Sequence, residues 1–276
     1  MAQPTKAAVK APVKKEEIVK QKPQEVEKIP DYLQRADGRP AAGFEEVSAG
    51  DMTVPQMRLC QSLTPQRDSS EPKYIDGLKE GEHFNTVTGK NYGKLVQIVP
   101  LMFFKNRIYF RDKKEGGGIL CRSEDMVNGI GEPGGKCATC PLNQFGSAKN
   151  GEGKGKACTE FYNFPAMVVD DEGLIHPEGL VVKSFKSSGV PVAKDWLALM
   201  RLRGIDMFGG VYEISSQKKT FTEGTSYLEV VKNAGNVKQE TYEAASQMYA
   251  MFSEMRKQGR IKVDQEIDEP GANDQV

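Results

Sequence analysis

The sequence predicts a mainly β chain of the α+β class, folded as a small β-barrel with a cysteine-rich loop insertion, two helices and disordered termini. Strand-like segments occur at uneven spacing with two isolated helical patterns, unlike the regular alternation of a βαβ sheet. With 38% hydrophobic residues, the 276-residue chain can bury a core. We expect a disordered arm at 1–40, a folded domain at 41–260 and an acidic disordered tail at 261–276.

Residues 1–40 are rich in Lys, Ala, Pro and Glu and nearly free of large apolar residues, which is the composition of a disordered arm. The fold should begin near Val54, Met57 and Leu59. The strongest β segment is "LVQIVPLMFFKNRIYFRD" at 95–112, which Pro100 interrupts. Further strands are expected at 161–169, 180–185, 211–215 and 226–231.

Two segments have helical patterns. In "PVAKDWLALMRLRG" at 191–204, Pro191 suits the first turn and Gly204 suits the end. In "TYEAASQMYAMFSEMRKQG" at 241–259, apolar residues recur at three- and four-residue steps before Gly259.

Four of the five cysteines lie at 121–158 in a Cys-x15-Cys-x2-Cys-x17-Cys pattern. The two-residue spacing between Cys137 and Cys140 lets two thiolates meet one tetrahedral ion, and Cys121 and Cys158 flank this pair. The segment has little apolar surface, so a metal would supply folding free energy, roughly 10–16 kcal/mol in small zinc peptides. We predict one structural Zn²⁺ ion bound by Cys121, Cys137, Cys140 and Cys158.

The sequence disfavours three other interpretations of these cysteines. Four unrelated buried cysteines would normally have apolar surroundings, which this segment lacks. A thioredoxin-like redox motif would open a helix after a strand, whereas this one lies between Gly-Gly and Pro. A catalytic zinc needs an open coordination position, and four thiolates leave none.

The sequence offers little else for enzymatic chemistry. The two histidines, His83 and His176, lie in polar loops, and we expect both at the surface. GxSxG, P-loop, HExxH and Rossmann motifs are missing, and neighbouring acids such as Asp170 and Asp171 would point to opposite faces of an extended chain. We therefore predict that the protein is not an enzyme.

The segment 102–111 places cations and aromatic rings on one face of a strand. Because side chains alternate along a strand, one face would carry Phe103, Lys105, Arg107, Tyr109 and Arg111. The core face would carry Met102, Phe104, Ile108 and Phe110, interrupted by Asn106. Cations that bind phosphates and aromatic rings that stack on unpaired bases are typical of a groove for single-stranded nucleic acid.

The same surface would extend through residues of other segments: Lys90, Tyr92, Lys94, Lys183, Phe185 and Lys186. Alternatively, this is a solvated strand whose rings cover a neighbouring element.

Several motifs follow one another in a distinctive order: "VPQMRLCQSLTP", a glycine-marked hairpin region, the basic aromatic strand, "C-(x15)-CATCP-(x17)-C", "YNFPAMVV" and a helix before "VYEI…SYLEVV". Over roughly residues 44–232, this order resembles the single-stranded DNA-binding proteins encoded by tailed bacteriophages. The resemblance implies an OB-like barrel with a zinc-binding loop insertion. It also implies a role in phage DNA replication, recombination or repair. The four cysteines depart from the T-even phage version, whose zinc ligands include a histidine.

We therefore expect a protein that coats single-stranded DNA without strong sequence preference. The last thirteen residues carry five acids and no base, so the tail would contact replication or recombination proteins. No segment approaches the ~20 apolar residues of a membrane span, and no signal peptide is visible, so we expect the host cytoplasm. The alternative function is a zinc-ribbon accessory or transcription factor that binds a polymerase. A metal-dependent nuclease would need a cluster of carboxylates and histidines that the sequence lacks.

Overall fold

The computed structural model describes residues 42–43, 45–46, 53–112, 115–148, 154–221, 224–261 and 263. The chain divides into two units, Met1–Pro40 and Ala41–Val276, and everything described below belongs to the second. The predicted arm at 1–40 lies outside the described residues, and so does the predicted tail apart from Ile261 and Val263.

The described residues form twelve strands and two α-helices. The strands are β1 (Gln56–Leu59), β2 (His83–Asn85), β3 (Asn91–Gly93), β4 (Leu95–Pro100), β5 (Phe104–Phe110), β6 (Ile119–Ser123), β7 (Asn128–Gly131), β8 (Gly135–Lys136), β9 (Thr159–Val169), β10 (Ile175–Phe185), β11 (Gly210–Phe221) and β12 (Gly224–Asn236). The helices are α1 (Val190–Leu202) and α2 (Gln239–Lys257).

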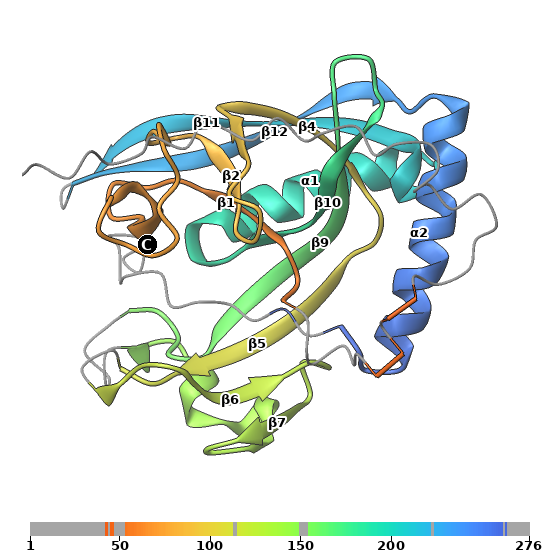
Figure 1. The fold of residues 1–276 in the computed structure, drawn as a ribbon. Helices are drawn as coiled ribbons and strands as arrows, with labels where there is room; N and C mark the ends of the chain where they lie inside the picture. Colours follow the sequence, from red (N-terminus) through yellow and green to blue (C-terminus); the bar gives the residue numbers. More distant parts are fainter. Residues whose placement is uncertain are drawn as a thin grey trace, which may run out of the picture. The chain divides into compact units, whose positions relative to one another are not determined.

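Strand β9 is the centre of the sheet (Figure 1). One of its edges pairs with β10, from which the sheet continues through β1 to β2 and β3. The other edge is shared, because residues 159–163 pair with β5 and residues 166–169 pair with β4. Beyond β5 lie β6, β7 and β8, whereas β4 leads to β11 and β12. The sheet therefore divides into two branches where Pro100 ends β4 and the chain restarts as β5.

Side chains alternate across the sheet and build one core on each face. On β9, Phe164 and Val168 belong to the first core, whereas Met167 and Val169 belong to the second. Helix α1 covers the first core with Trp196, whose ring centroid lies 4.4 Å from that of Phe164. Helix α2 covers the second core with its buried face. Helix α2 is therefore held by the apolar stripe that its sequence predicts, and α1 is held by the buried residues Ala193, Trp196 and Met200.

The prediction of a mainly β chain with two helices is confirmed. Pro191 lies in the first turn of α1, and Gly204 and Gly259 follow the ends of α1 and α2 with φ values of +65° and +67°. Positive φ is strained for residues with a Cβ, so glycine suits both positions. Strands β6, β7 and β8, in contrast, lie in the segment for which the sequence predicted a loop.

The sheet does not close into the predicted barrel. Among the described strands, no backbone ladder joins β12 to β1, β2 or β3. Side chains bridge this gap instead. The Gln61 side chain donates from Nε2 to the carbonyl of Tyr227 at 2.8 Å and accepts at Oε1 from the N–H of Tyr227 at 2.9 Å. Gly81 lies so close to the Tyr227 ring that a Cβ would come within 2.7 Å of it. The alternation of side chains along a strand predicts which residues face the core, but it does not predict whether the two edge strands of the sheet pair.

Candidate metal centre

The four-cysteine segment extends the sheet beyond β5. Tyr109 of β5 pairs with Cys121 of β6, and Cys121 pairs in turn with Gly131 of β7. Strand β7 then pairs with β8, which leads directly to Cys137. Figure 1 shows these strands at the end of the sheet away from α1. We call residues 121–158 the insertion.

Asp125 holds the turn between β6 and β7. Its Oδ1 accepts hydrogen bonds from the backbone N–H groups of Asn128 and Val127, each at 2.8 Å. Its Oδ2 accepts from the side-chain amide of Asn128 at 3.0 Å. These donors hold the pKa of Asp125 well below its ordinary value. The hairpin that carries Cys121 is therefore fixed by a local turn rather than by apolar packing.

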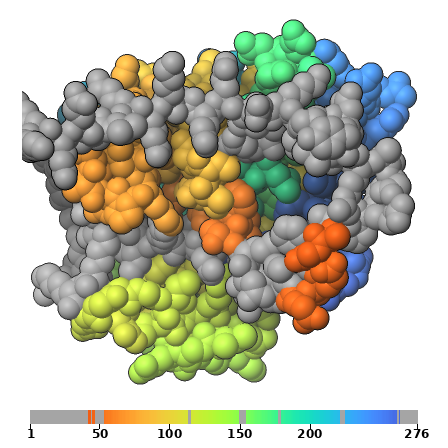
Figure 2. Space-filling view, in the orientation of Figure 1, coloured from red at the N-terminus to blue at the C-terminus, as the bar shows by residue number. Residues whose placement is uncertain are grey.

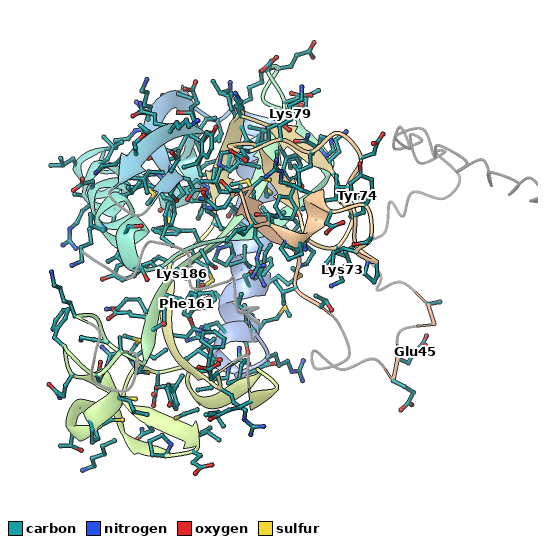
Figure 3. The ribbon with its side chains drawn as sticks, turned by 90° about the vertical axis from the view of Figure 1, so that its left-hand side faces the viewer. Glu45, Lys73, Tyr74, Lys79, Phe161 and Lys186 are labelled. Atoms are coloured by element: carbon teal, nitrogen blue, oxygen red, sulfur yellow. The ribbon has the colours of Figure 1, made fainter. Side chains whose placement is uncertain are left out.

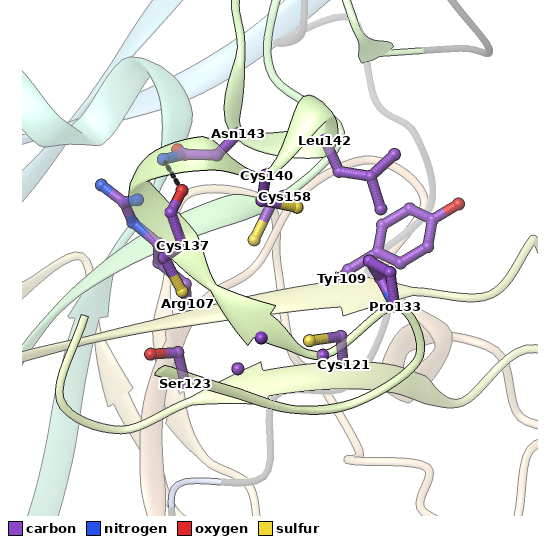
Figure 4. A pocket seen from close by; sticks show the side chains of 13 residues that line it. Arg107, Tyr109, Cys121, Ser123, Pro133, Cys137, Cys140, Leu142, Asn143 and Cys158 are labelled. Atoms are coloured by element: carbon purple, nitrogen blue, oxygen red, sulfur yellow. Dashed lines mark hydrogen bonds between the residues drawn. The ribbon is translucent and has the colours of Figure 1, made fainter. Parts of the chain in front are cut away.

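Backbone hydrogen bonds bring the other three cysteines together. Cys137–Thr139 form a short 3₁₀ turn that ends at Cys140. The side-chain amide of Asn143 donates to the carbonyl of Cys137 at 2.8 Å, the dashed contact in Figure 4. The N–H of Cys158 donates to the carbonyl of Leu142 at 2.9 Å. Cysteines distant in the sequence are thus tied to one turn.

One pocket is lined by all four cysteines of the insertion. Figure 4 shows the sulfur atoms of Cys121, Cys137, Cys140 and Cys158 facing the space between them, and none of them forms a disulfide. The fifth cysteine, Cys60, is buried elsewhere, in a small apolar cluster. The structure therefore brings together the four residues that the sequence predicted as metal ligands.

Glycines allow the backbone to approach this pocket closely. A Cβ on Gly129 would lie 2.8 Å from the sulfur of Cys121. Gly134 has a φ of +68°, and a Cβ there would lie 2.8 Å from the carbonyl oxygen of Gly131. Positive φ is strained for a residue with a Cβ, so glycine suits the turn at Gly134, and the lack of a Cβ at Gly129 leaves room for the sulfur of Cys121.

The donor set suits a soft or borderline ion. Four sulfurs in tetrahedral arrangement are typical of structural zinc, whereas Mg²⁺ and Ca²⁺ prefer oxygen. Among the described residues, no three His, Cys, Asp or Glu side chains already form a coordination sphere. The thiols border one pocket, and side-chain rotation would have to bring their sulfurs to Zn–S distances of about 2.3 Å. Burial raises the pKa of the Cys158 thiol to about 11, against the opposing effect of Arg107.

Strand β5 alternates as predicted. Phe104, Asn106 and Ile108 are buried, whereas Lys105, Arg107 and Tyr109 are less buried on the other face. The polar Asn106 on the core face accepts a hydrogen bond at Oδ1 from the side-chain amide of Asn163 at 2.9 Å. The register with β6 then shifts between Tyr109 and Phe110, so the alternation holds only as far as Tyr109.

The outer face of β5 is not an open groove. Arg107 and Tyr109 line the cysteine pocket. Lys105 Nζ lies 2.8 Å from Glu160 Oε1, and a terminal nitrogen of Arg107 lies 3.3 Å from Glu160 Oε2. Burial raises the pKa of Glu160, but Lys105 and Arg107 lower it more, so it lies below the ordinary value. The insertion and Glu160 therefore occupy the face on which the sequence predicted DNA contacts.

Burial removes Lys183 and Phe185 from the predicted DNA-binding surface. Lys183 is only 3% exposed, its ammonium group pairs with Glu229 of β12, and its Nζ lies 5.0 Å from the Phe185 ring centroid. Phe185 belongs to the first core. His83, predicted at the surface, is fully buried with Nε2 3.2 Å from Oε1 of Glu229. The residue pattern of one strand cannot show that a charged side chain has an ion-pair partner on another strand, as Lys183 has in Glu229.

The remaining predicted DNA contacts are scattered. Tyr92 and Phe103 pack against the first core, and the Tyr92 hydroxyl accepts a hydrogen bond from the side-chain amide of Asn85 at 3.2 Å. The four remaining cations come from the ends of β3, β5 and β10. Lys94 and Arg111 are exposed, whereas Lys90 and Lys186 are half-buried.

Sequence reasoning missed Phe145, which is 82% exposed on the insertion. Lys156 Nζ lies 4.9 Å from its ring centroid, and Lys136 and Lys154 are exposed in the same segment. In Figure 2 the insertion, in yellow-green, forms the lower end of the face shown. The stretch "FGSAKNGEGKGK" combines an aromatic residue with lysines among glycines, so this exposed group could have been noticed from the sequence.

A second exposed group lies on the connection between β1 and β2. Figure 3 shows Lys73, Tyr74 and Lys79 there, apart from Lys186. The Tyr74 hydroxyl donates to Asp76 Oδ1 at 3.2 Å. Because Asp76 and other acids interrupt the lysines, the charge of this group is mixed.

Residues 20–258 match the family described as Pam3 phage gp34-like protein. No curated protein and no solved structure is detectably similar to the chain. Within the described residues, no helix is both long enough and apolar enough to span a membrane.

Proposed function

Because the chain belongs to the Pam3 phage gp34-like family, a family of phage proteins, we propose that it binds single-stranded DNA during phage DNA replication, recombination or repair. It coats the strand without strong sequence preference and performs no catalysis. The observation that carries this proposal is the exposed Phe145 ring with Lys156 beside it on the insertion. An exposed ring stacks unpaired bases of any sequence, and lysines meet the phosphates.

A structural Zn²⁺ ion bound by Cys121, Cys137, Cys140 and Cys158 is the second part of the proposal. Among the described residues of the insertion, the buried hydrophobic ones are Cys137 and Ala148. So small a core cannot offset the backbone entropy of the segment, at ~1–2 kcal/mol per ordered residue. The metal supplies folding free energy and holds the four thiols as a closed set with no open position, so its role is structural.

Single-stranded DNA would bind to the insertion rather than along strand β5. Lys105 and Arg107 already face Glu160, whereas Lys136 and Lys154 are exposed near Phe145 in the sequence. In this proposal the OB-like part of the sheet consists of β9, β4, β11 and β12. Instead of a closing backbone ladder, hydrogen bonds made by the Gln61 side chain connect β12 to the segment that follows β1. The acidic tail contacts replication or recombination proteins in the host cytoplasm.

Fluorescence anisotropy with a labelled single-stranded oligonucleotide tests the proposal. Phe145→Ala should weaken binding by about 5- to 150-fold, the equivalent of ~1–3 kcal/mol for one stacked base. The slope of log K against log salt should stay unchanged, because stacking releases no counterions. Leu202→Ala, which removes an exposed side chain from the end of α1, is the matched control and should bind like the original chain. Equal affinity of Phe145→Ala and Leu202→Ala would contradict the proposed contact.

One observation favours the rival function of a polymerase-binding accessory factor. Ile130 is 79% exposed and Val127 is also exposed, so the insertion presents apolar side chains to solvent. Retention on single-stranded compared with double-stranded DNA cellulose separates the two functions. A chain that elutes from both at low salt would favour the accessory factor.

A further inference from the structure

Arg107 is the one described cation that lines the cysteine pocket. Its side chain is 15% exposed, and its Nε is buried without a hydrogen-bond partner. The register explains its position, because Arg107 pairs with Ser123 of β6 on one edge and with Glu160 of β9 on the other. Cys121 lies two residues before Ser123, and Cys158 lies two residues before Glu160. Arg107 therefore lies between the two strands that bring the outlying cysteines to the pocket.

The two ends of the Arg107 guanidinium have different environments. A terminal nitrogen meets Glu160 Oε2 at 3.3 Å, so that end has a partner. The Nε–H has none, although a buried donor without an acceptor costs about 1–3 kcal/mol. Buried donors in proteins normally have acceptors, so the orphaned Nε–H calls for one, and the cysteine sulfurs of the same pocket become strong acceptors when a metal holds them as thiolates. Figure 4 shows Arg107 at the edge of the pocket, on the side of Cys137.

A zinc ion with four thiolates has a net charge of −2, since four charges of −1 add to one of +2. A charge of this size in a partly buried pocket needs nearby donors and a compensating cation. Thiolate sulfur accepts hydrogen bonds, and a guanidinium supplies both a donor and a positive charge.

We propose that Arg107 is a part of the zinc centre, donating its Nε–H to a cysteine thiolate and offsetting the charge of the metal-bound set. This inference rests on the proposed zinc site. It assigns Arg107 a positioning role and takes it out of the predicted phosphate contacts. Lys105, two residues earlier on the same face, differs because its ammonium is paired with Glu160 and lies 5.1 Å from the Tyr162 ring centroid.

Competition with a chromophoric zinc chelator measures the effect in the full chain. Arg107→Gln should weaken zinc binding by about 10- to 100-fold, the usual cost of losing an outer partner of a metal site. Lys105→Gln, the matched control on the same strand face, should bind zinc like the original chain. Arg107→Lys keeps the charge without the Nε–H geometry and should recover only part of the loss.

Replacing zinc by Co²⁺ gives a second measurement, the energy of the thiolate-to-cobalt charge-transfer band. A loss of packing alone would not change this energy. The thiolate-to-cobalt charge-transfer band should keep its intensity in Arg107→Gln, because the four ligands remain, but its energy should shift. If the original chain binds no zinc, the zinc site itself is wrong. If the original chain binds zinc tightly and Arg107→Gln binds it equally well, only the role of Arg107 is wrong. If Arg107→Gln fails to fold, Arg107→Lys decides, and affinity equal to the original chain overturns the inference.

Discussion

Replacing Glu229 by Gln should destabilise the protein through two buried partners. Glu229 of β12 is paired with Lys183 of β10, and its Oε1 lies 3.2 Å from Nε2 of His83 on β2. Its side chain is 10% exposed, and those of its partners are more deeply buried. Because no described backbone ladder joins β12 to β1, β2 or β3, this carboxylate is one of the few links across the open side of the sheet.

The expected loss follows from the charge that remains. Gln keeps the size of the side chain but leaves the Lys183 ammonium buried without a counter-ion. Removing one partner of a buried pair costs about 3–5 kcal/mol. Since whole domains are stable by only about 5–15 kcal/mol, this is a large fraction of the total. The double variant with Lys183→Met should recover part of the loss, because no buried charge then lacks a partner.

The pH dependence has a definite sign. Burial raises the pKa of Glu229, but Lys183 and His83 lower it more, so the folded-state pKa lies below the ordinary value. The ionised form is therefore favoured by folding. Its contribution is fully present above the unfolded pKa of about 4.3 and is lost as the pH falls through the folded-state pKa. The difference between the original chain and Glu229→Gln should shrink in that acidic range.

Urea unfolding of the full chain at pH 7 and at several lower values measures both effects. Glu71→Gln, which changes an exposed glutamate, is the control and should stay within about 0.5 kcal/mol of the original chain. If Glu229→Gln unfolds at the same urea concentration as Glu71→Gln at pH 7, the pair contributes no stability and the reasoning fails. A difference that stays constant down to the lowest pH would refute the assigned pKa direction.

Three further predictions follow. The purified chain should contain one zinc ion, and Cys140→Ser should release it while far-ultraviolet circular dichroism keeps most of its β signal; elemental analysis without bound metal would contradict this. Ile108→Ala should lower the free energy of unfolding by about 2–5 kcal/mol in a urea titration, because its side chain is fully buried. Deleting residues 264–276, which carry five acids and no base, should tighten single-stranded DNA binding at low salt, and anisotropy showing equal affinity would rule out competition by the tail.

The fold was predictable where a local pattern carries the information. The apolar stripe of α2, and the glycines that follow the ends of both helices, are visible in the sequence and present in the structure. The break at Pro100 was also predictable, because proline disturbs a strand locally. The short strands of the insertion were not, since their glycines carry no alternation of side chains.

The site was predictable to a lesser degree. Cysteine spacing indicated which four residues share a pocket, because two thiols separated by two residues can reach one ion and the other two cysteines flank that pair. Alternation indicated the outer face of β5, but it cannot show that the insertion folds back over Arg107 and Tyr109. Lys183 appeared as a surface cation because its partner Glu229 lies 46 residues further along the chain.

The shared use of β5 bears on the proposed zinc site, because the insertion would depend on the metal whereas the sheet would not. The inner side chains Phe104 and Ile108 are buried, while Arg107 and Tyr109 on the outer face line the cysteine pocket. Pairing with β9 holds residues 104–108 from the other edge, whatever happens at β6. Loss of the proposed metal would break the metal–sulfur bonds that link the four cysteines, but it would leave the β5–β9 ladder and both cores in place. In the proposed function, β5 is therefore the rigid base on which the zinc-dependent insertion would fold and contact single-stranded DNA.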